Sequence, residues 1–379
     1  MISKNRDLPL YKNDAVSCCS NSQEQEEEMS YVDSEGFLAG IIETAINQVA
    51  RIKTDLTAAD KIGSFKARWG VGRMSYAVAP GIYAVGQPTP ESPVLVSANY
   101  KLSFDSLRKE LSGLDLWILV IDTKGINVWC AAGKGTFGTS EIVRMIEKTS
   151  LSKLVNHRRL ILPQLGAPGV AAHRVKAESD FRVTYGPVRA GDLPAFFKSG
   201  SKAEPEMRST TFTLADRLVL TPVEIVALLK PLAGLALAIF LLSSAALLVG
   251  GDQYRLAAVI VQTAQILLPF ILAALTGAVL APALLPYIPG RALAWKGWIL
   301  GMLLAVILVV NAYSSASWLL QGSYLLAIPA IASFLSLNFT GSTTYTSLSG
   351  VVKEMGVALP VMIISASLGA VALIVSFFI

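Results

Sequence analysis

The chain has 379 residues, of which 53% are hydrophobic, and a formal net charge of +5. This modest charge, without an Arg/Lys stripe interleaved with aromatic residues, excludes nucleic acid as an expected partner. The three cysteines form no CxxC pair, which excludes a disulfide framework and the usual zinc or iron–sulfur patterns. A cytoplasmic, reducing setting agrees with this cysteine usage.

Charge is distributed unevenly along the chain. Beyond residue 231 the only charged residues are Asp252, Arg255, Arg291, Lys296, Lys353 and Glu354. A soluble unit of that size needs a more polar surface, so we expect this part to face lipid. The sequence therefore predicts a disordered tail over 1–35, an α/β domain over 36–200, a linker over 201–225 and an all-α transmembrane domain over 226–379.

The predicted tail is polar and contains the acidic run Glu24–Glu28. Its composition favours disorder. It also lacks the apolar core of a secretory signal peptide. The adjacent Cys18 and Cys19 are expected to be unstructured thiols, with metal binding and acylation as alternatives.

In the α/β domain, short apolar runs alternate with segments of helical spacing. The runs expected to be buried strands are Val94–Ala98, Leu116–Thr123, Arg159–Leu165 and Phe181–Val188. Helices are expected at Phe104–Leu111 and Ser140–Lys148. Such alternation predicts a Rossmann-like parallel sheet flanked by helices. Ligands of such sheets bind beyond the carboxyl ends of the strands. The loops expected around one site are Asn99–Ser103, Lys124–Thr139, Gly166–Ala172 and Gly186–Arg189.

Five membrane-spanning helices are expected, because a helix needs about 20 apolar residues to cross the hydrocarbon core. The predicted spans are 231–251, one between Arg255 and Arg291, two between Lys296 and Lys353 with a turn at 311–315, and one after Glu354. With the α/β domain in the cytoplasm, Arg291, Lys296 and Lys353 all fall in inside loops. This bias predicts a multi-pass protein of the cytoplasmic membrane.

The stretch Gly125–Thr139 follows a predicted strand and opens a predicted helix, and three interpretations compete for it. A phosphate-binding P-loop requires Gly at the position of Val128 and Ser or Thr at the position of Gly135, so this pattern fails twice. A catalytic Cys130 requires a base. The sequence does not place His157 or His173 beside it.

The third interpretation is a helix that caps a cofactor. Amide donors and the helix dipole near a helix start favour a thiolate at Cys130. A thiolate is a soft metal ligand. Small neighbours allow a large planar ligand to lie against the backbone; they are Ala131, Ala132, Gly133 and Gly135.

The octapeptide Asn127-Val128-Trp129-Cys130-Ala131-Ala132-Gly133-Lys134 resembles the cap-helix signature of the mercury-methylating corrinoid proteins. The wider region, roughly 80–195, resembles the corrinoid-binding domain of the corrinoid iron–sulfur protein of the acetyl-CoA pathway. The combination of one such domain with five spans also resembles the mercury-methylating family. The alternative histidine motif of corrinoid proteins, Asp-x-His-x-x-Gly, is absent.

This resemblance implies that Cys130 is the lower axial ligand of the cobalt in cobalamin or a related corrinoid. The residues implied to contact the corrin around it are Asn127, Val128, Trp129, Ala131, Ala132, Gly133, Lys134, Gly135 and Thr136. By the strand-end rule we also expect cofactor contacts from Asn99, Gly166, Ala167, Gly169 and Val170. Ordinary turn chemistry is the alternative for these five.

The resemblance further implies a methyltransferase that makes methylmercury. A methyl-folate or a methyl donor protein would supply the methyl group, which passes through methyl-cobalt to inorganic Hg(II). A ferredoxin-like protein with two [4Fe–4S] clusters would return the cobalt to its reduced state. The alternative function is a membrane-anchored corrinoid carrier of one-carbon metabolism. A coupled transporter is disfavoured because the spans contain almost no ionisable residues.

Overall fold

The structure is a computed structural model that describes residues 36–46, 48–249, 256–339 and 348–379. The predicted disordered tail, with Cys18, Cys19 and the acidic run, lies outside the described residues. The chain divides into two compact units. The first contains the described residues up to Ala67 together with Val71–Thr210, and the second contains Arg68–Gly70 with Thr211–Ile379.

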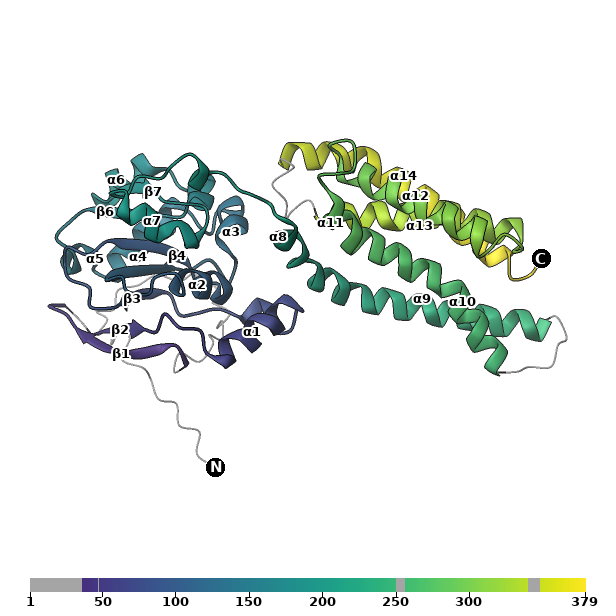
Figure 1. Cartoon of the computed structure of the whole chain (residues 1–379), viewed down its shortest axis with the longest axis horizontal. Helices are drawn as coiled ribbons and strands as arrows, with labels where there is room; N and C mark the ends of the chain where they lie inside the picture. The colour runs from purple at the N-terminus through teal and green to yellow at the C-terminus, as the bar shows by residue number, and fades with distance from the viewer. Residues whose placement is uncertain (1–35, 47, 250–255, 340–347) are drawn as a thin grey trace, which may run out of the picture. The chain divides into compact units, whose positions relative to one another are not determined.

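The described part of the first unit is built on a seven-stranded sheet in the order β1-β2-β3-β5-β4-β6-β7 (Figure 1). Its strands are β1 (Leu38–Glu43), β2 (Gln48–Ile52), β3 (Gly81–Val85), β4 (Val94–Ala98), β5 (Leu116–Ile121), β6 (Arg159–Leu162) and β7 (Arg182–Tyr185). The four predicted strands correspond to β4–β7, and they are mutually parallel.

The sheet as a whole is mixed, which corrects the prediction of a parallel sheet. β1 pairs with β2 and β3 pairs with β5 in antiparallel fashion. The first three strands were not predicted from the sequence. β1 is an edge strand whose side chains are mostly exposed, so it lacks the buried apolar run that identified the central strands.

Helices cover both faces of the sheet. On one face, alternate residues of β4 and β5 pack against α3 (Val128–Lys134), α4 (Thr139–Lys148), α5 (Leu151–Leu154) and α6 (Ala172–Ser179). On the other, the intervening residues pack against α2 (Lys101–Arg108) and α7 (Leu193–Lys198). Both faces of the central strands are therefore apolar, as is usual for parallel strands between two helix layers. A further helix, α1 (Ala58–Arg68), precedes β3.

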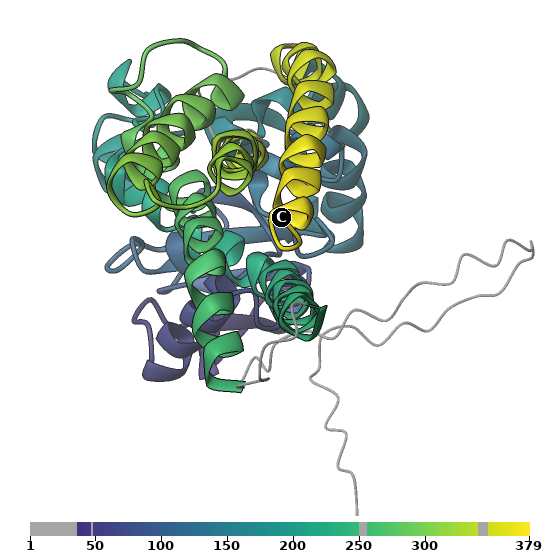
Figure 2. The same cartoon turned by 90° about the vertical axis from the view of Figure 1, so that its right-hand side faces the viewer.

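The second unit is all-helical in its described residues. Its elements are α8 (Leu214–Leu218), α9 (Thr221–Val249), α10 (Leu256–Leu275), the π-helical turn η6 (Thr276–Leu280), α11 (Ala281–Leu284), α12 (Leu293–Asn311), α13 (Trp318–Asn338) and α14 (Leu348–Val375). Figure 2 gives a second view of these helices. The segment expected as a linker, 201–225, contains α8 and the start of α9.

Five described helical segments are long and apolar enough to cross a membrane, which confirms the expected number, length and composition of these helices. They are Leu214–Val249, Leu256–Leu284, Leu293–Asn311, Trp318–Asn338 and Gly350–Val375. The turn expected at 311–315 falls between the end of α12 and the start of α13.

Charged side chains of the second unit cap its helix ends. The Arg217 guanidinium donates to the carbonyl of Ala283 at 2.7 Å, and the Lys296 ammonium donates to the carbonyl of Leu285. The Glu354 carboxylate accepts from the backbone N–H of Ala294 at 2.6 Å. These contacts satisfy backbone groups that a helix terminus leaves unpaired, which is costly in an apolar setting.

Candidate functional site

The parallel strands β4 and β5 end side by side, and the buried Asn99 organises the loop that follows β5. Its side-chain Oδ1 accepts from the backbone N–H of Thr123 at 3.1 Å, from the Thr123 hydroxyl at 2.8 Å and from the N–H of Gly125 at 3.0 Å. Its Nδ2 donates to Asp122 at 3.1 Å. Asn99 therefore positions the loop 122–125, while a direct cofactor contact of Asn99 stays a prediction.

This hydrogen-bonded chain continues into α3. The single proton of the Thr123 hydroxyl is shared between Asn99 Oδ1 and the carbonyl of Ile126, which lies 2.6 Å from the hydroxyl oxygen. Asn127 is the N-cap of α3, and its side chain accepts from the backbone N–H of Cys130 at 2.9 Å. Such a cap fixes the start of a helix and contributes about 1 kcal/mol. Asn99, Thr123 and Asn127 together determine where Cys130 lies.

The residues of the octapeptide divide between two faces of α3. Ala131 and Ala132 are buried in the core beneath the helix. Trp129 is 41% exposed, Gly133 and Lys134 are exposed, and Cys130 is half-buried. The outer face that a planar ligand would meet is therefore formed by Trp129, Cys130, Gly133 and Lys134, and the structure gives Ala131 and Ala132 a packing role.

Gly135 ends α3 in the left-handed region, with φ of 84°, and its N–H donates to the carbonyl of Ala132. A residue with a Cβ is disfavoured there. Thr136 is half-buried, and its hydroxyl lies 3.5 Å from the carbonyl of Ala131.

The loop after β6 supports α3 from the core side. It forms the short 3-10 helix η3 (Gln164–Gly169), and a Cβ at Gly169 would overlap the Phe137 carbonyl and come within 3.0 Å of the Ala132 Cα. A Cβ at Gly166 would clash with the Phe137 ring. These glycines allow the backbone of the loop to approach α3, so their structural role is close packing.

Two further hydrogen bonds hold this loop. The hydroxyl of Tyr185, at the end of β7, donates to the carbonyl of Val170 at 2.9 Å. Burial raises the pKa of Tyr185, so it stays a donor at neutral pH. The Thr139 hydroxyl accepts from the N–H of Ala171 at 2.9 Å. Val170 is buried, whereas Ala167 is half-buried.

The structure thus joins three of the four predicted loops, namely those after β4, β5 and β6. The fourth, Gly186–Arg189, pairs instead with the segment that leaves the unit, because Val188 N–H donates to the Met207 carbonyl at 2.8 Å. Thr123, Gln164 and Phe137 were not predicted as site residues from the sequence. The strand-end rule identifies the first two, since each lies two residues beyond a parallel strand.

The residues on the outer face of α3 fit a corrinoid. Apart from the adjoining backbone, no heavy atom of the described residues lies within 4 Å of a Cβ placed on Gly133 or Gly135, so the space beside them is open. The buried Oε1 of Gln164 accepts no hydrogen bond in the described structure, and a corrin carries amide groups that could donate to it. The Cys130 thiol supplies a soft metal ligand.

The described residues give less support to the competing interpretations. His157 uses both ring nitrogens locally, with Nε2 at 2.8 Å from the Ser92 carbonyl and Nδ1 accepting from the N–H of Arg159. It therefore serves a structural role. No group of three or more His, Cys, Asp or Glu side chains arranged for a metal ion occurs among the described residues.

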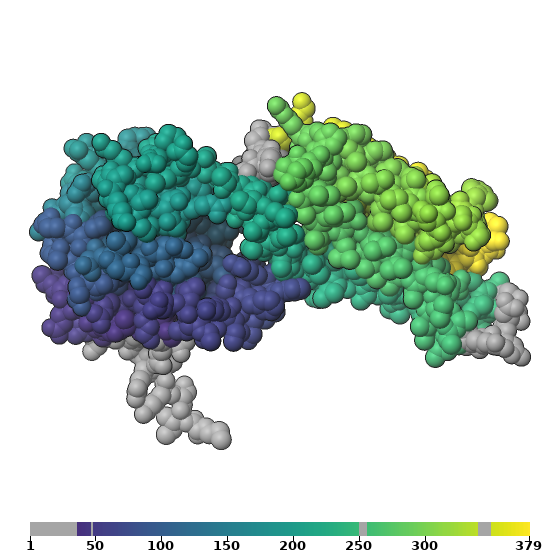
Figure 3. Space-filling view, viewed as in Figure 1, coloured from purple at the N-terminus to yellow at the C-terminus, as the bar shows by residue number. Residues whose placement is uncertain are grey.

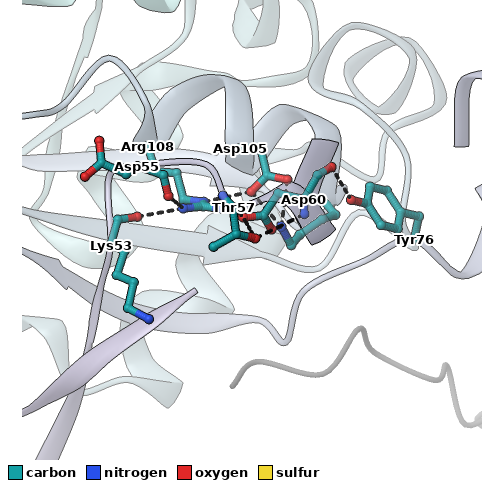
Figure 4. Close-up of polar contacts among 8 residues, drawn as sticks. Lys53, Asp55, Thr57, Asp60, Tyr76, Asp105 and Arg108 are labelled. Atoms are coloured by element: carbon teal, nitrogen blue, oxygen red, sulfur yellow. Dashed lines mark hydrogen bonds and ion pairs between the residues drawn. The ribbon is translucent and has the colours of Figure 1, made fainter. Parts of the chain in front are cut away.

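A second polar cluster, which the sequence analysis did not anticipate, lies between α1 and α2 (Figure 4). Lys101 bridges Asp60 at 2.8 Å and Asp105 at 2.7 Å, and Arg108 bridges the same two carboxylates at 2.8 and 2.7 Å. All four side chains are buried. Burial by itself raises the pKa of Asp60. Hydrogen bonds from Lys101, Thr57 and Arg108 outweigh burial and hold this pKa far below its ordinary value.

The fold and the site define a mixed α/β unit with a cysteine-bearing helix at the carboxyl edge of its parallel strands, followed by membrane-length helices. Residues 71–196 match the family model described as CO dehydrogenase/acetyl-CoA synthase delta subunit. This stretch contains the whole candidate site.

The chain is also similar to gamma subunits of the acetyl-CoA decarbonylase/synthase complex. It is 30% identical to that of Archaeoglobus fulgidus over 128 residues, which cover 33% of this chain and 27% of the relative. It is 35% identical to gamma subunit 2 of Methanosarcina thermophila over 132 residues, with 33% and 27% covered. The chain thus spans about a quarter of the length of these relatives.

Proposed function

We propose that this chain is a membrane-anchored, corrinoid-dependent methyltransferase that transfers a methyl group to inorganic Hg(II). The observation that carries the proposal is the position of Cys130, which lies half-buried at the start of α3. The Asn127 cap and the hydrogen bonds of Asn99 to the preceding loop hold it there. The similarity to subunits of the acetyl-CoA decarbonylase/synthase complex supports corrinoid chemistry of one-carbon groups. The resemblance of the octapeptide supports mercury as the acceptor.

When bound, the corrinoid supplies a cobalt centre that can take a methyl group from one partner and release it to another. Cys130 would hold the cobalt through its thiolate. A thiolate donates more electron density to a metal than an imidazole does, and an electrophilic acceptor such as Hg(II) is served by that donation.

The neighbouring residues hold the ligand in place. Asn127 accepts the backbone N–H of Cys130 and so fixes the first turn of α3, where the Cys130 thiol is half-buried. Trp129 offers an exposed apolar ring beside it, and the open space at Gly133 and Gly135 admits a planar ring system. Lys134 and the Gln164 Oε1 are proposed to bind polar groups at the corrin rim.

Two partners and one location belong to the proposal. A ferredoxin-like protein with two [4Fe–4S] clusters would supply electrons, and a methyl-folate or methyl donor protein would supply the methyl group. The bilayer is the cytoplasmic membrane, with the first unit on the cytoplasmic side, as the positions of Arg291, Lys296 and Lys353 favour.

The test is methylmercury formation by the full chain in detergent, loaded with methylcobalamin and supplied with Hg(II) under anaerobic conditions. Cys130→Ala should abolish product. Because Hg(II) binds any thiol, the matched control is the double variant Cys18→Ala/Cys19→Ala, which should retain activity. Full activity in Cys130→Ala would refute the assignment.

A second candidate function is a methyl carrier of one-carbon metabolism, which the similarity to the gamma subunits favours. The same loaded protein can be offered a biological thiol in place of Hg(II). Faster transfer to the thiol than to Hg(II) would favour the carrier.

A further inference from the structure

Helix α1 presents an apolar surface to the outside of the fold. Ile62 and Phe65, three residues apart on one face of the helix, are 55% and 62% exposed, and Val71 and Met74 just beyond it are 62% and 75% exposed. We call these four side chains the α1 patch. Figure 3 shows the α1 segment at the surface. Exposed apolar residues clustered in this way mark an interaction surface.

The opposite face of α1 is clamped to the fold. Asp60 is buried and pairs with Lys101 and Arg108 of α2, and Ala67 is fully buried. The N-terminus of α1 is also fixed, because Thr57 and Asp60 hydrogen-bond each other's backbone N–H groups at 2.9 and 3.2 Å. Ile62 and Phe65 therefore cannot turn inward without breaking a buried ion-pair cluster.

Basic residues flank the α1 patch along the described chain. Lys61, Lys66 and Arg68 are exposed on α1, and Arg73 follows it. Asp60 is the single acidic residue between positions 56 and 90, and it is buried in the ion-pair cluster. Apolar side chains flanked by Lys and Arg are the pattern of helices that lie in a membrane interface.

We propose that the α1 patch docks on the surface of the bilayer that the chain's own membrane helices cross, with Lys61 and Lys66 at anionic headgroups. Charge complementarity favours the bilayer over a protein partner, since lysine is depleted in the cores of protein interfaces. The family match begins at residue 71, so Ile62 and Phe65 of the α1 patch lie outside the matched residues, whereas Val71 and Met74 lie inside them.

Because the membrane helices already hold the chain at the bilayer, a weak contact of the α1 patch with the lipid surface is enough for docking. The first unit is tethered to the bilayer through the segment 199–213, so the second contact is intramolecular and has an effective concentration on the order of millimolar. A two-point attachment would limit the orientations that the first unit samples. This proposal does not depend on the corrinoid or on mercury.

The test uses the full chain in vesicles of phosphatidylcholine with and without phosphatidylglycerol. A photoreactive p-azidophenylalanine replaces Phe65, and the matched control carries it at Ile41, which is 54% exposed on β1. We expect lipid adducts from position 65, enriched at least several-fold over position 41 and increased by phosphatidylglycerol. Replacing Lys61 and Lys66 by Gln should weaken the surface contact roughly 30-fold.

Three results would overturn the proposal. One is equal lipid labelling from positions 65 and 41. Another is labelling at position 65 that is confined to protein, either this chain or a co-purified partner. The third is lipid labelling that is unaffected by phosphatidylglycerol and by the two Lys→Gln changes, which would remove the basic residues from the contact.

Discussion

Replacing Asn99 by Ala should loosen the loop that positions Cys130. The change removes the acceptor of two buried backbone N–H groups, those of Thr123 and Gly125, and the donor to Asp122. An unsatisfied buried donor costs about 1–3 kcal/mol. We expect the local stability of the loop to fall by about 2–4 kcal/mol, the lower value applying if water enters the space.

Hydrogen exchange on the full chain measures this effect directly, because it reports local opening without requiring a two-state transition of a two-unit protein. The amides of Thr123 and Gly125 should exchange roughly 30- to 1,000-fold faster in Asn99→Ala. The matched control is Asn156→Ala, whose side chain makes an exposed hydrogen bond to Glu91 at 2.7 Å. That variant should leave both amides unchanged.

A second readout separates positioning from general destabilisation. In the chain loaded with cobalamin, Asn99→Ala should broaden or partly shift the visible bands even at temperatures where the first unit stays folded. Unchanged exchange at Thr123 and Gly125 together with an unchanged spectrum would refute the reasoning, since Asn99 would then have no role in placing α3.

Three further predictions follow from individual contacts. Asn127→Ala should lower the stability of α3 by about 1 kcal/mol, because it removes the cap of the helix. Hydrogen exchange of the Cys130 amide should then be roughly fivefold faster, and an unchanged exchange rate would contradict the role of the cap. Gly169→Ala should weaken corrinoid binding in a titration, because its Cβ would press against Ala132 and displace α3. The control is Gly113→Ala, which adds backbone strain at a φ of 76° but brings its Cβ within 4 Å of no atom among the described residues. Because the pKa of Asp60 is depressed in the folded chain, its ion pairs should stabilise α1 at neutral pH. This contribution to stability should decline as the pH falls below about 4 and further as it falls toward the folded pKa. Hydrogen exchange of the α1 amides, corrected for intrinsic rates, measures the decline, and a rate that is flat down to about pH 3 would contradict it.

The central strands and the apolar helices of membrane-crossing length were predictable because their sequences leave one physical solution. β4, β5 and β6 are short runs of Val, Leu and Ile between turn residues, and the spans lack charge over membrane length. β1 and β2 were not predictable from the same signal. β1 lies at the edge of the sheet with mostly exposed side chains, and β2 has no continuous apolar run, although its Val49, Ala50 and Ile52 are buried.

The candidate site shows the same division. The strand-end rule correctly brought Asn99 together with the loop that precedes Cys130, because neighbouring parallel strands end at one edge. The rule could not predict that the Asn99 side chain accepts hydrogen bonds from backbone N–H groups, or that Ala131 and Ala132 face the core. Both features depend on side-chain direction. The ion-pair cluster of Asp60 and Arg108 joins residues far apart in the chain, so only the tertiary structure reveals it.

The most direct test of the account is the visible absorption spectrum of the anaerobically purified full chain reconstituted with cobalamin, compared with Cys130→Ala and with Cys18→Ala/Cys19→Ala. The account predicts a bound corrinoid whose bands change when Cys130 is replaced and stay in place when the other two thiols are removed. Tight binding with identical bands in all three proteins would contradict thiolate ligation by Cys130, and failure of the wild-type chain to bind cobalamin would contradict the assignment of a corrinoid site.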